Sequence, residues 1–444
     1  MKLNMFMNAI AVLAAKGVFF ILTIIAYNGM NEDSFAHYGV LLLLYSTVVG
    51  VVGQAMQMTA NKYVAQGIGL RSFTVRSAFF VGLGGLITGI AAHFHYSASL
   101  ISALSIGLAL LFGTFLSYNI GCMYGARGAF QPALIYIVQL ILVAAAGFTS
   151  VYSARPVETL FIYISLISLF LLVVSQCLTP SPPAETQANA WDVSKSVTFP
   201  VVFAGLASSS VFLLVVEIIR SGQNFADEMT VFTLANQVRM VVATIPLLFG
   251  NVIIKLLARQ VDKENSGLQT SYLNYYSAII PSLLTVLVLD AVCEIWSSKF
   301  GDPQAYFLTT MFLYGTAITS FKSGIGRNIL SQGLGKISIL SNIIWSLMFI
   351  IGCYVSYIVN YGVVGIGVAF LTSHLLHYVL FRGTFKKNNV LRISERDSVV
   401  SGFFIISIAG ATGAGMGWGY IDNAILTCLF LFIVFVKYKE KNVD

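Results

Sequence analysis

The sequence predicts an all-α integral membrane protein, built as two halves of six helices each and a final pair of helices. Two compositional observations support this fold class. Of the 444 residues, 57% are hydrophobic and only 10% are charged, whereas soluble domains carry about 25% charged residues. The apolar runs are about twenty residues long, the length that a helix needs to cross a bilayer. They are continuous rather than alternating, which excludes the strands of a membrane barrel.

We expect about 14 transmembrane helices. Their approximate ranges are 5–28, 38–60, 77–95, 100–123, 131–151, 157–178, 198–219, 230–254, 272–293, 304–320, 337–358, 361–381, 399–418 and 421–437. The last pair has the weakest pattern, because 421–437 is short and 413–419 is rich in glycine. Twelve helices followed by a loose hairpin is therefore the alternative.

The distribution of lysine and arginine is the third observation, and it predicts the orientation. If the N-terminus is cytoplasmic, 20 of the 25 basic residues fall in cytoplasmic segments, Lys322 among them, and three fall in outer loops. Cytoplasmic loops of membrane proteins are enriched in lysine and arginine. One missed helix would invert every later loop, so we expect an even number of helices and two cytoplasmic termini.

A proline-rich stretch divides the chain. Thr179 begins the sequence Thr-Pro-Ser-Pro-Pro-Ala-Glu, which cannot continue a helix. The expected organisation is an N-terminal six-helix lobe, a cytoplasmic linker, a C-terminal six-helix lobe, and a basic cytoplasmic loop with the helix pair. Their ranges are 1–180, 181–197, 198–385 and 386–444.

Motifs for enzymatic chemistry are absent from the sequence. It has no P-loop, no His-Glu-x-x-His and no nucleophile elbow, and no loop exceeds about twenty residues. The five cysteines are scattered and form no Cys-x-x-Cys pair. His374 and His377 share a helix face, but neither cysteine nor acid accompanies them. We therefore expect no catalytic residues, no cofactor, no metal and no nucleic-acid partner.

Charged residues at bilayer depth are the main candidates for a functional site, because each costs several kcal/mol unless it faces a partner or a wet cavity. Lys16 lies midway along the first span and Arg239 lies well inside the eighth. We expect them to bind an anionic group as cavity cations. Glu217 and Arg220, near the outer end of span seven, are outer gate candidates, with a local i,i+3 ion pair as the simpler reading.

Polar side chains on neighbouring spans are candidates for lining the same cavity, although each is more often a helix–helix hydrogen bond. They are Gln54, Gln57, Asn119, Gln139, Asn236 and Gln237. Two further lysines, Lys62 and Lys255, occupy matching cytoplasmic helix ends in the two halves, which suggests a weak internal repeat.

Four segments carry a resemblance to a known family. They are Tyr38-Gly-Val, the helix end Lys62-Tyr-Val-Ala, Ala235-Asn-Gln-Val-Arg-Met followed by Ile245-Pro246, and Gly362-Val-Val-Gly365-Ile-Gly-Val-Ala. Over about residues 1–385 the chain resembles the Wzx-type polysaccharide flippases. These are the O-antigen or capsule repeat-unit translocases of the multidrug/oligosaccharidyl-lipid/polysaccharide exporter superfamily.

The resemblance implies a fold and a substrate. The fold would have two six-helix lobes around a central cavity that opens alternately to each side. The substrate would be a lipid-linked oligosaccharide on undecaprenyl pyrophosphate, moved across the bacterial plasma (inner) membrane. Partners would be this substrate, membrane lipids and other polysaccharide-assembly proteins.

Two related functions remain as alternatives. An ion-coupled multidrug exporter of the same superfamily commonly uses an acid buried in the first lobe, and this sequence has none inside a first-half span. A peptidoglycan-precursor flippase differs in substrate more than in physics. A membrane polymerase or glycosyltransferase would need an acid cluster or a large outer loop, and neither is present.

Overall fold

The structure, a computed structural model, describes residues 2–179, 189–257, 274–275, 277–286, 302–331 and 335–387. Side chains are described at 6–179, 189–246, 274–275, 277–286, 302–323 and 339–380. Every regular element in these ranges is a helix, and nine described helical segments are long and apolar enough to cross a membrane. This confirms the all-α membrane fold class.

Two compact units make up the chain, Met1–Thr230 and Val231–Asp444. Most of the described elements belong to the first unit. They are α1 (Lys2–Gly29), α2 (Glu32–Val48), η1 (Val49–Gly53), α3 (Gln54–Ala65), α4 (Arg71–Phe94), α5 (Leu100–Ala126), α6 (Phe130–Ser150), α7 (Pro156–Leu178), α8 (Ala190–Val193), η2 (Ser194–Thr198) and α9 (Phe199–Arg220).

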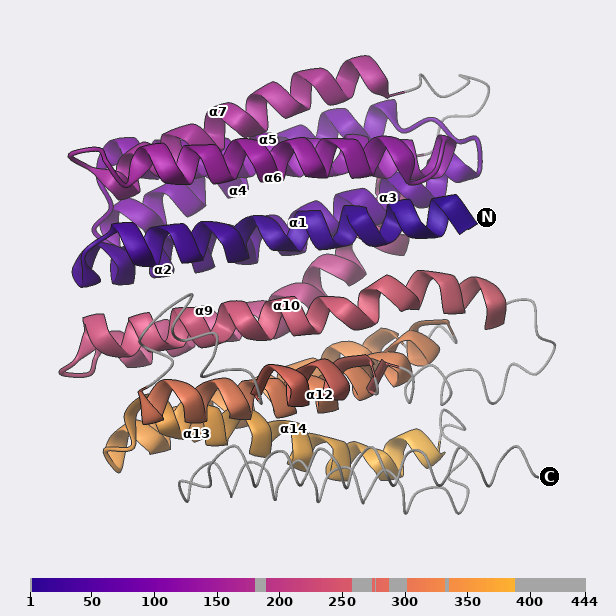
Figure 1. Cartoon of the computed structure of the whole chain (residues 1–444). Helices are drawn as coiled ribbons and strands as arrows, with labels where there is room; N and C mark the ends of the chain where they lie inside the picture. The colour runs from indigo at the N-terminus through magenta and orange to yellow at the C-terminus, as the bar shows by residue number, and fades with distance from the viewer. Residues whose placement is uncertain are drawn as a thin grey trace. The chain divides into compact units, whose positions relative to one another are not determined.

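The first unit is built by long helices that pack side by side (Figure 1). The helix α1 lies along α6, while α5 contacts α3, α4 and α7. The short π-helical turn η1 joins α2 to α3, so that Glu32–Ala65 is one continuous span. A second π-helical turn, η2, leads into α9. Such turns add a residue to the helical ladder and re-aim the side chains that follow.

The second unit contains α12 (Pro303–Ser331), α13 (Gly335–Ile358) and α14 (Gly362–Lys387), and α14 packs against both of the others. The helix α10 (Phe225–Leu257) begins in the first unit and continues into the second. A short apolar helix, Ser277–Val286, is also described. The side chains of α12 are almost continuously buried from Phe307 to Ile318, as expected for a helix surrounded by protein.

The predicted spans agree closely with the helices. The first seven correspond to membrane-length helices whose ends differ from the predictions by up to eight residues, and 337–358 and 361–381 correspond to α13 and α14. The range 230–254 falls in α10. Part of 272–293, and all of 399–418 and 421–437, lie outside the described residues, so the choice between 12 and 14 helices stays open.

One helix extends well beyond its predicted span. The tenth span is predicted to end at 320, with Lys322 in a cytoplasmic segment. The helix α12 instead continues to Ser331, so Lys322 lies inside it. The reason is that no proline interrupts the stretch and Lys322 has buried partners in the fold.

The lobe boundary expected at 181–197 stays a prediction. The compact units divide later, at Thr230, which groups α9 with the first unit. Two hydrogen bonds join η2, which leads into α9, to α3. Thr59 Oγ1 lies 2.9 Å from Thr198 Oγ1, and the Tyr63 hydroxyl lies 2.8 Å from Ser196 Oγ.

Glycines allow a close helix contact between α4 and α5 in the first unit. A Cβ added at Gly85 of α4 would lie 2.8 Å from the carbonyl oxygen of Gly107, and one at Gly107 of α5 would lie 2.8 Å from that of Gly85. Small residues at a membrane helix interface let two backbones approach each other. The α4–α5 pair therefore depends on the absence of side chains at both positions.

Candidate functional site

The described helices carry charge in their interiors with one sign only. More than two turns from either end of a helix, the charged residues of the described ranges are Lys16, Arg239 and Lys322. Every described aspartate and glutamate lies near a helix end or in a connection. Lys16 and Arg239 thus lie inside helices, far from the helix ends, and Lys322 is a third such residue.

Lys16 is half-buried in α1, on the helix that lies along α6. Its neighbour Gly17 faces the Leu140 side chain of α6. Among the residues that the structure describes, no carboxylate lies within ion-pair distance of the Lys16 amino group. An ammonium at this depth without a counter-charge requires water or an anionic ligand.

Arg239 has protein partners within the second unit. Its Nε donates a hydrogen bond to Asn236 Oδ1 at 2.9 Å. The guanidinium carbon lies 5.7 Å from the ring centre of Phe370 on α14 and 6.0 Å from that of Phe312 on α12. Stacking against two aromatic rings stabilises the cation in a poorly hydrated place.

Lys322 of α12 lies among two histidines of α14. Its Nζ is 2.9 Å from His374 Nδ1 and 2.8 Å from His377 Nδ1. On the far sides of the rings, His374 Nε2 lies 2.9 Å from Thr319 Oγ1 and His377 Nε2 lies 2.7 Å from Ser341 Oγ. We call Lys322, His374 and His377 the three-base cluster. It joins α12, α13 and α14.

Aromatic rings connect the three-base cluster to Arg239. The indole of Trp345 on α13 stacks on His374 with ring centres 4.5 Å apart, and Lys322 Nζ lies 6.0 Å from the indole centre. Phe370 contacts His374 at 4.7 Å on one side and Arg239 on the other. In the described part of the second unit, basic and aromatic side chains therefore lie together.

The outer gate candidates take part in a different contact from the one expected. The simpler prediction, an ion pair between Glu217 and Arg220, is wrong. Glu217 Oε2 instead pairs with His95 Nε2 at 3.1 Å, and Arg220 donates a hydrogen bond to the His95 carbonyl oxygen. Through these contacts, Glu217 and Arg220 bind the turn after α4 to the C-terminal end of α9. Burial and the adjacent Glu217 carboxylate raise the pKa of Tyr96 in the same turn.

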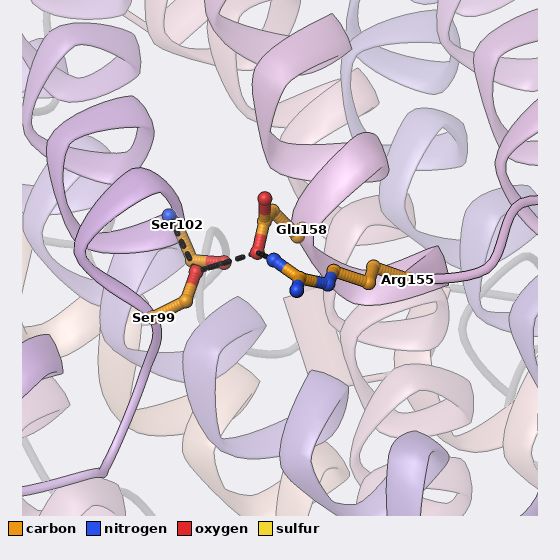
Figure 2. Close-up of polar contacts among 4 residues, drawn as sticks. All are labelled: Ser99, Ser102, Arg155 and Glu158. Atoms are coloured by element: carbon orange, nitrogen blue, oxygen red, sulfur yellow. Dashed lines mark hydrogen bonds and ion pairs between the residues drawn. The ribbon is translucent and has the colours of Figure 1, made fainter.

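The same turn is also fastened to α7, as Figure 2 shows. Ser99 Oγ donates to Glu158 Oε2 at 2.8 Å and accepts from the Ser102 backbone N–H at 3.1 Å. Arg155 lies 3.6 Å from the same carboxylate oxygen. The α4–α5 connection therefore contacts two other helices at their predicted outer ends.

The polar candidates divide by their contacts. Asn119 donates to Ser175 Oγ at 2.8 Å between α5 and α7, which is a structural helix–helix hydrogen bond. Asn236 accepts from Arg239, and Gln237 is buried beside it. Of the remaining amides, Gln54 is exposed, and Gln57 and Gln139 are half-buried.

Of the two helix-end lysines, only Lys62 lies in a range where the structure describes side chains. Lys62 is exposed at the end of α3, 5.5 Å from the ring centre of Tyr63. Lys255 lies near the end of α10, where side chains are outside the described ranges.

Sequence reasoning missed the three-base cluster. The i,i+3 spacing of His374 and His377 was recognised, but no cysteine or acid accompanied it. The partner of the two histidines is a lysine rather than an acid, Lys322, and it lies on a helix about fifty residues earlier in the chain.

Comparison with solved structures identifies the fold. The chain matches the inward-facing conformation of a multidrug resistance MATE family transporter with a TM-score of 0.62, covering 87% of this chain and 100% of that one at 15% identity. It matches the lipid II flippase MurJ, in an inward closed conformation, with a TM-score of 0.70 and 12% identity over 100% and 99% of the two chains. The fold is that of the MOP superfamily transporters.

A third match is a MOP superfamily transporter from Pyrococcus furiosus, whose description reports a binding pocket of reversed polarity that suggests a different function. Its TM-score is 0.52, with 13% identity over 93% of this chain and 96% of that one. No protein-family profile matches the sequence, and no curated protein sequence matches it significantly. The similarity therefore lies in the fold.

Proposed function

We propose that this multi-pass membrane protein flips an undecaprenyl-pyrophosphate-linked oligosaccharide across the bacterial plasma membrane by alternating access. Sugars and pyrophosphate do not cross hydrocarbon by themselves, because each desolvated polar group costs free energy. A wet, cationic passage through protein lowers that barrier while the prenyl tail stays in lipid. This transport breaks no covalent bond.

The observation that carries the proposal is the sign of the interior charge. Lys16, Arg239 and Lys322 are basic, and the described helix interiors contain no acid. A passage for cationic drugs needs the opposite sign, since like charges repel in a low-dielectric site. An anionic headgroup such as pyrophosphate fits a basic interior.

The fold supports the same class of substrate. The match to the lipid II flippase extends over the whole chain, whereas that to the multidrug transporter covers 87% of it. A flippase for a lipid-linked substrate and this chain would then share a scaffold and differ in the sugar they recognise. Because fold alone does not determine function, the argument for the substrate rests on the basic residues inside the helices.

Roles follow for the candidate residues. Lys16 and Arg239 bind the pyrophosphate during the transport cycle, with the ammonium and the guanidinium acting as donors. Lys62 and Lys255 attract the anionic lipid at the cytoplasmic surface, and Glu217 with Arg220 controls the outer opening. Gln54, Gln57, Gln139 and Gln237 contact the sugars.

The experiment is complementation in two bacterial strains. One lacks its repeat-unit flippase and the other is depleted of its peptidoglycan-precursor flippase. We expect the chain to restore surface polysaccharide in the first strain, measured by polysaccharide immunoblotting, and not to rescue growth of the second. Rescue of the second strain alone would assign the precursor as substrate. Rescue of neither, at normal protein levels, would contradict both flippase functions.

A drug-resistance assay separates the remaining alternative. Cells that express the chain are exposed to lipophilic cations and their efflux is followed by fluorescence. The proposal predicts no efflux above that of empty-vector cells, whereas pumping that responds to an ion gradient would favour the multidrug exporter.

A further inference from the structure

The three-base cluster has a hydrogen-bond arrangement that fixes its proton positions. The Thr319 hydroxyl donates to the Gly315 carbonyl at 2.9 Å, so its oxygen accepts from His374 Nε2–H. A lysine ammonium only donates, so Nδ1 of both histidines accepts from Lys322. His377 then carries its proton on Nε2 and donates it to Ser341 Oγ. Both imidazoles are neutral when Lys322 is charged.

Two of the three N–H groups of the ammonium have hydrogen-bond partners. Two point to the Nδ1 atoms of the histidines, and the third has the face of Trp345 available. No carboxylate in the described part of the chain lies within ion-pair distance of Lys322. Imidazole lone pairs and an aromatic face, rather than an acid, stabilise this charge.

Loss of one proton leaves the hydrogen bonds intact. If the Lys322 ammonium releases a proton, the resulting amine keeps two N–H groups and still donates to both Nδ1 atoms. The net charge of the cluster then falls from +1 to zero. The site is satisfied both with and without this proton, which is the property of an exchangeable site.

Gain of a further proton breaks the arrangement. A proton on either Nδ1 would place an N–H group against a Lys322 N–H group. One Lys–His hydrogen bond would be lost, and α12 would separate from α14 at that point. His374 and His377 are each only 3% exposed, so water compensates poorly for the loss.

The surroundings oppose additional charge as well. The helix α12 supplies Lys322, and α14 supplies His374 and His377. The described part of α13 faces the cluster with the uncharged Ser341 and Trp345, while α10 supplies Arg239 on the other side of Phe370. The charged groups named here, Lys322 and Arg239, are both basic.

We propose that Lys322, His374 and His377 form a proton-binding site in the second unit, which holds one exchangeable proton on Lys322 and keeps its hydrogen bonds between α12 and α14 with or without that proton. As the coupling site of transport, it rests on the proposed flippase function. Both histidines stay neutral in the two states, and a second proton would separate α12 from α14 at this point.

Histidine NMR tests the site directly and without a substrate. The chain has five histidines, so the full-length protein with ¹⁵N-labelled histidine in lipid nanodiscs gives few signals, assigned by single His→Gln variants. We expect His374 and His377 to show an unprotonated Nδ1 and a protonated Nε2. On titration they should shift together, with one proton for the cluster.

The variant Lys322→Met removes the donor and keeps a side chain of similar length. We expect the Nδ1 signals of both histidines to shift and the two rings to titrate as a pair that takes up its own proton. Lys195→Met, at an exposed lysine in η2, is the matched control and should leave both signals unchanged. Histidines that titrate separately, that carry their proton on Nδ1, or that ignore Lys322→Met would overturn the proposal.

The wild-type spectrum tests the proposed proton positions even if the Lys322→Met protein is not produced in sufficient amounts. Complementation then separates coupling from function. If wild type restores polysaccharide and Lys322→Met at equal protein level does not, the site couples transport. Full restoration by Lys322→Met would overturn the coupling. The expected histidine signals in a chain that complements neither strain would leave the proton site standing and contradict the flippase function.

Discussion

Single residues in the second unit show how aromatic rings and neutral polar groups contact a cation inside a helix. Arg239 uses two phenyl faces and an amide, and Lys322 uses two imidazole lone pairs and an indole face. Their chemistry is specific to the side chain, because a guanidinium is planar and stacks whereas an ammonium is compact and strongly hydrated. The two basic residues are therefore not interchangeable.

Replacing Arg239 by lysine tests this difference. We expect Arg239→Lys to lower the stability of the protein by about 1 kcal/mol, because the stacking on Phe312 and Phe370 is lost. Thermal unfolding in detergent measures the change. Arg76→Lys, at an exposed position on α4, is the control and should be neutral. Equal stability of Arg239→Lys and wild type would show that the stacking is unimportant.

Pairs of helices are specified by small local features. The sequence predicted most helix ranges because long apolar runs must form helices in lipid. It did not predict the π-helical turns η1 and η2 or the extension of α12 beyond 320. Lys322 looks like a loop residue in a hydropathy pattern, and only its contacts with His374 and His377 explain its place inside a helix.

The α4–α5 contact gives a prediction at this scale. In Gly85→Leu the new side chain meets the Gly107 carbonyl, so we expect a loss of about 1–3 kcal/mol of stability from overpacking. The control is Gly84→Leu, since a Cβ at Gly84 has no atom within 4 Å. Thermal unfolding of the two variants should differ clearly. A Gly84→Leu protein as unstable as Gly85→Leu would contradict the close contact.

The whole molecule combines a transporter-like fold with basic residues inside the described helices. The sequence predicted the fold class and the absence of acids inside the spans of the first half. It could not predict which helices supply partners to a buried cation, because those partners are far apart in the chain. For the same reason Asn119 was grouped with cavity candidates, although it bonds Ser175.

At this scale the proposed function predicts that an anionic lipid-linked sugar passes basic residues inside the helices. Lys16 is the most direct point of attack, because no described carboxylate lies within ion-pair distance of it. The measurement is surface polysaccharide in cells that lack their repeat-unit flippase and express Lys16→Gln or Lys16→Arg at wild-type levels. The account predicts at least a tenfold loss for Lys16→Gln, equivalent to about 1.4 kcal/mol, and substantial retention for Lys16→Arg. Full export by Lys16→Gln would contradict it.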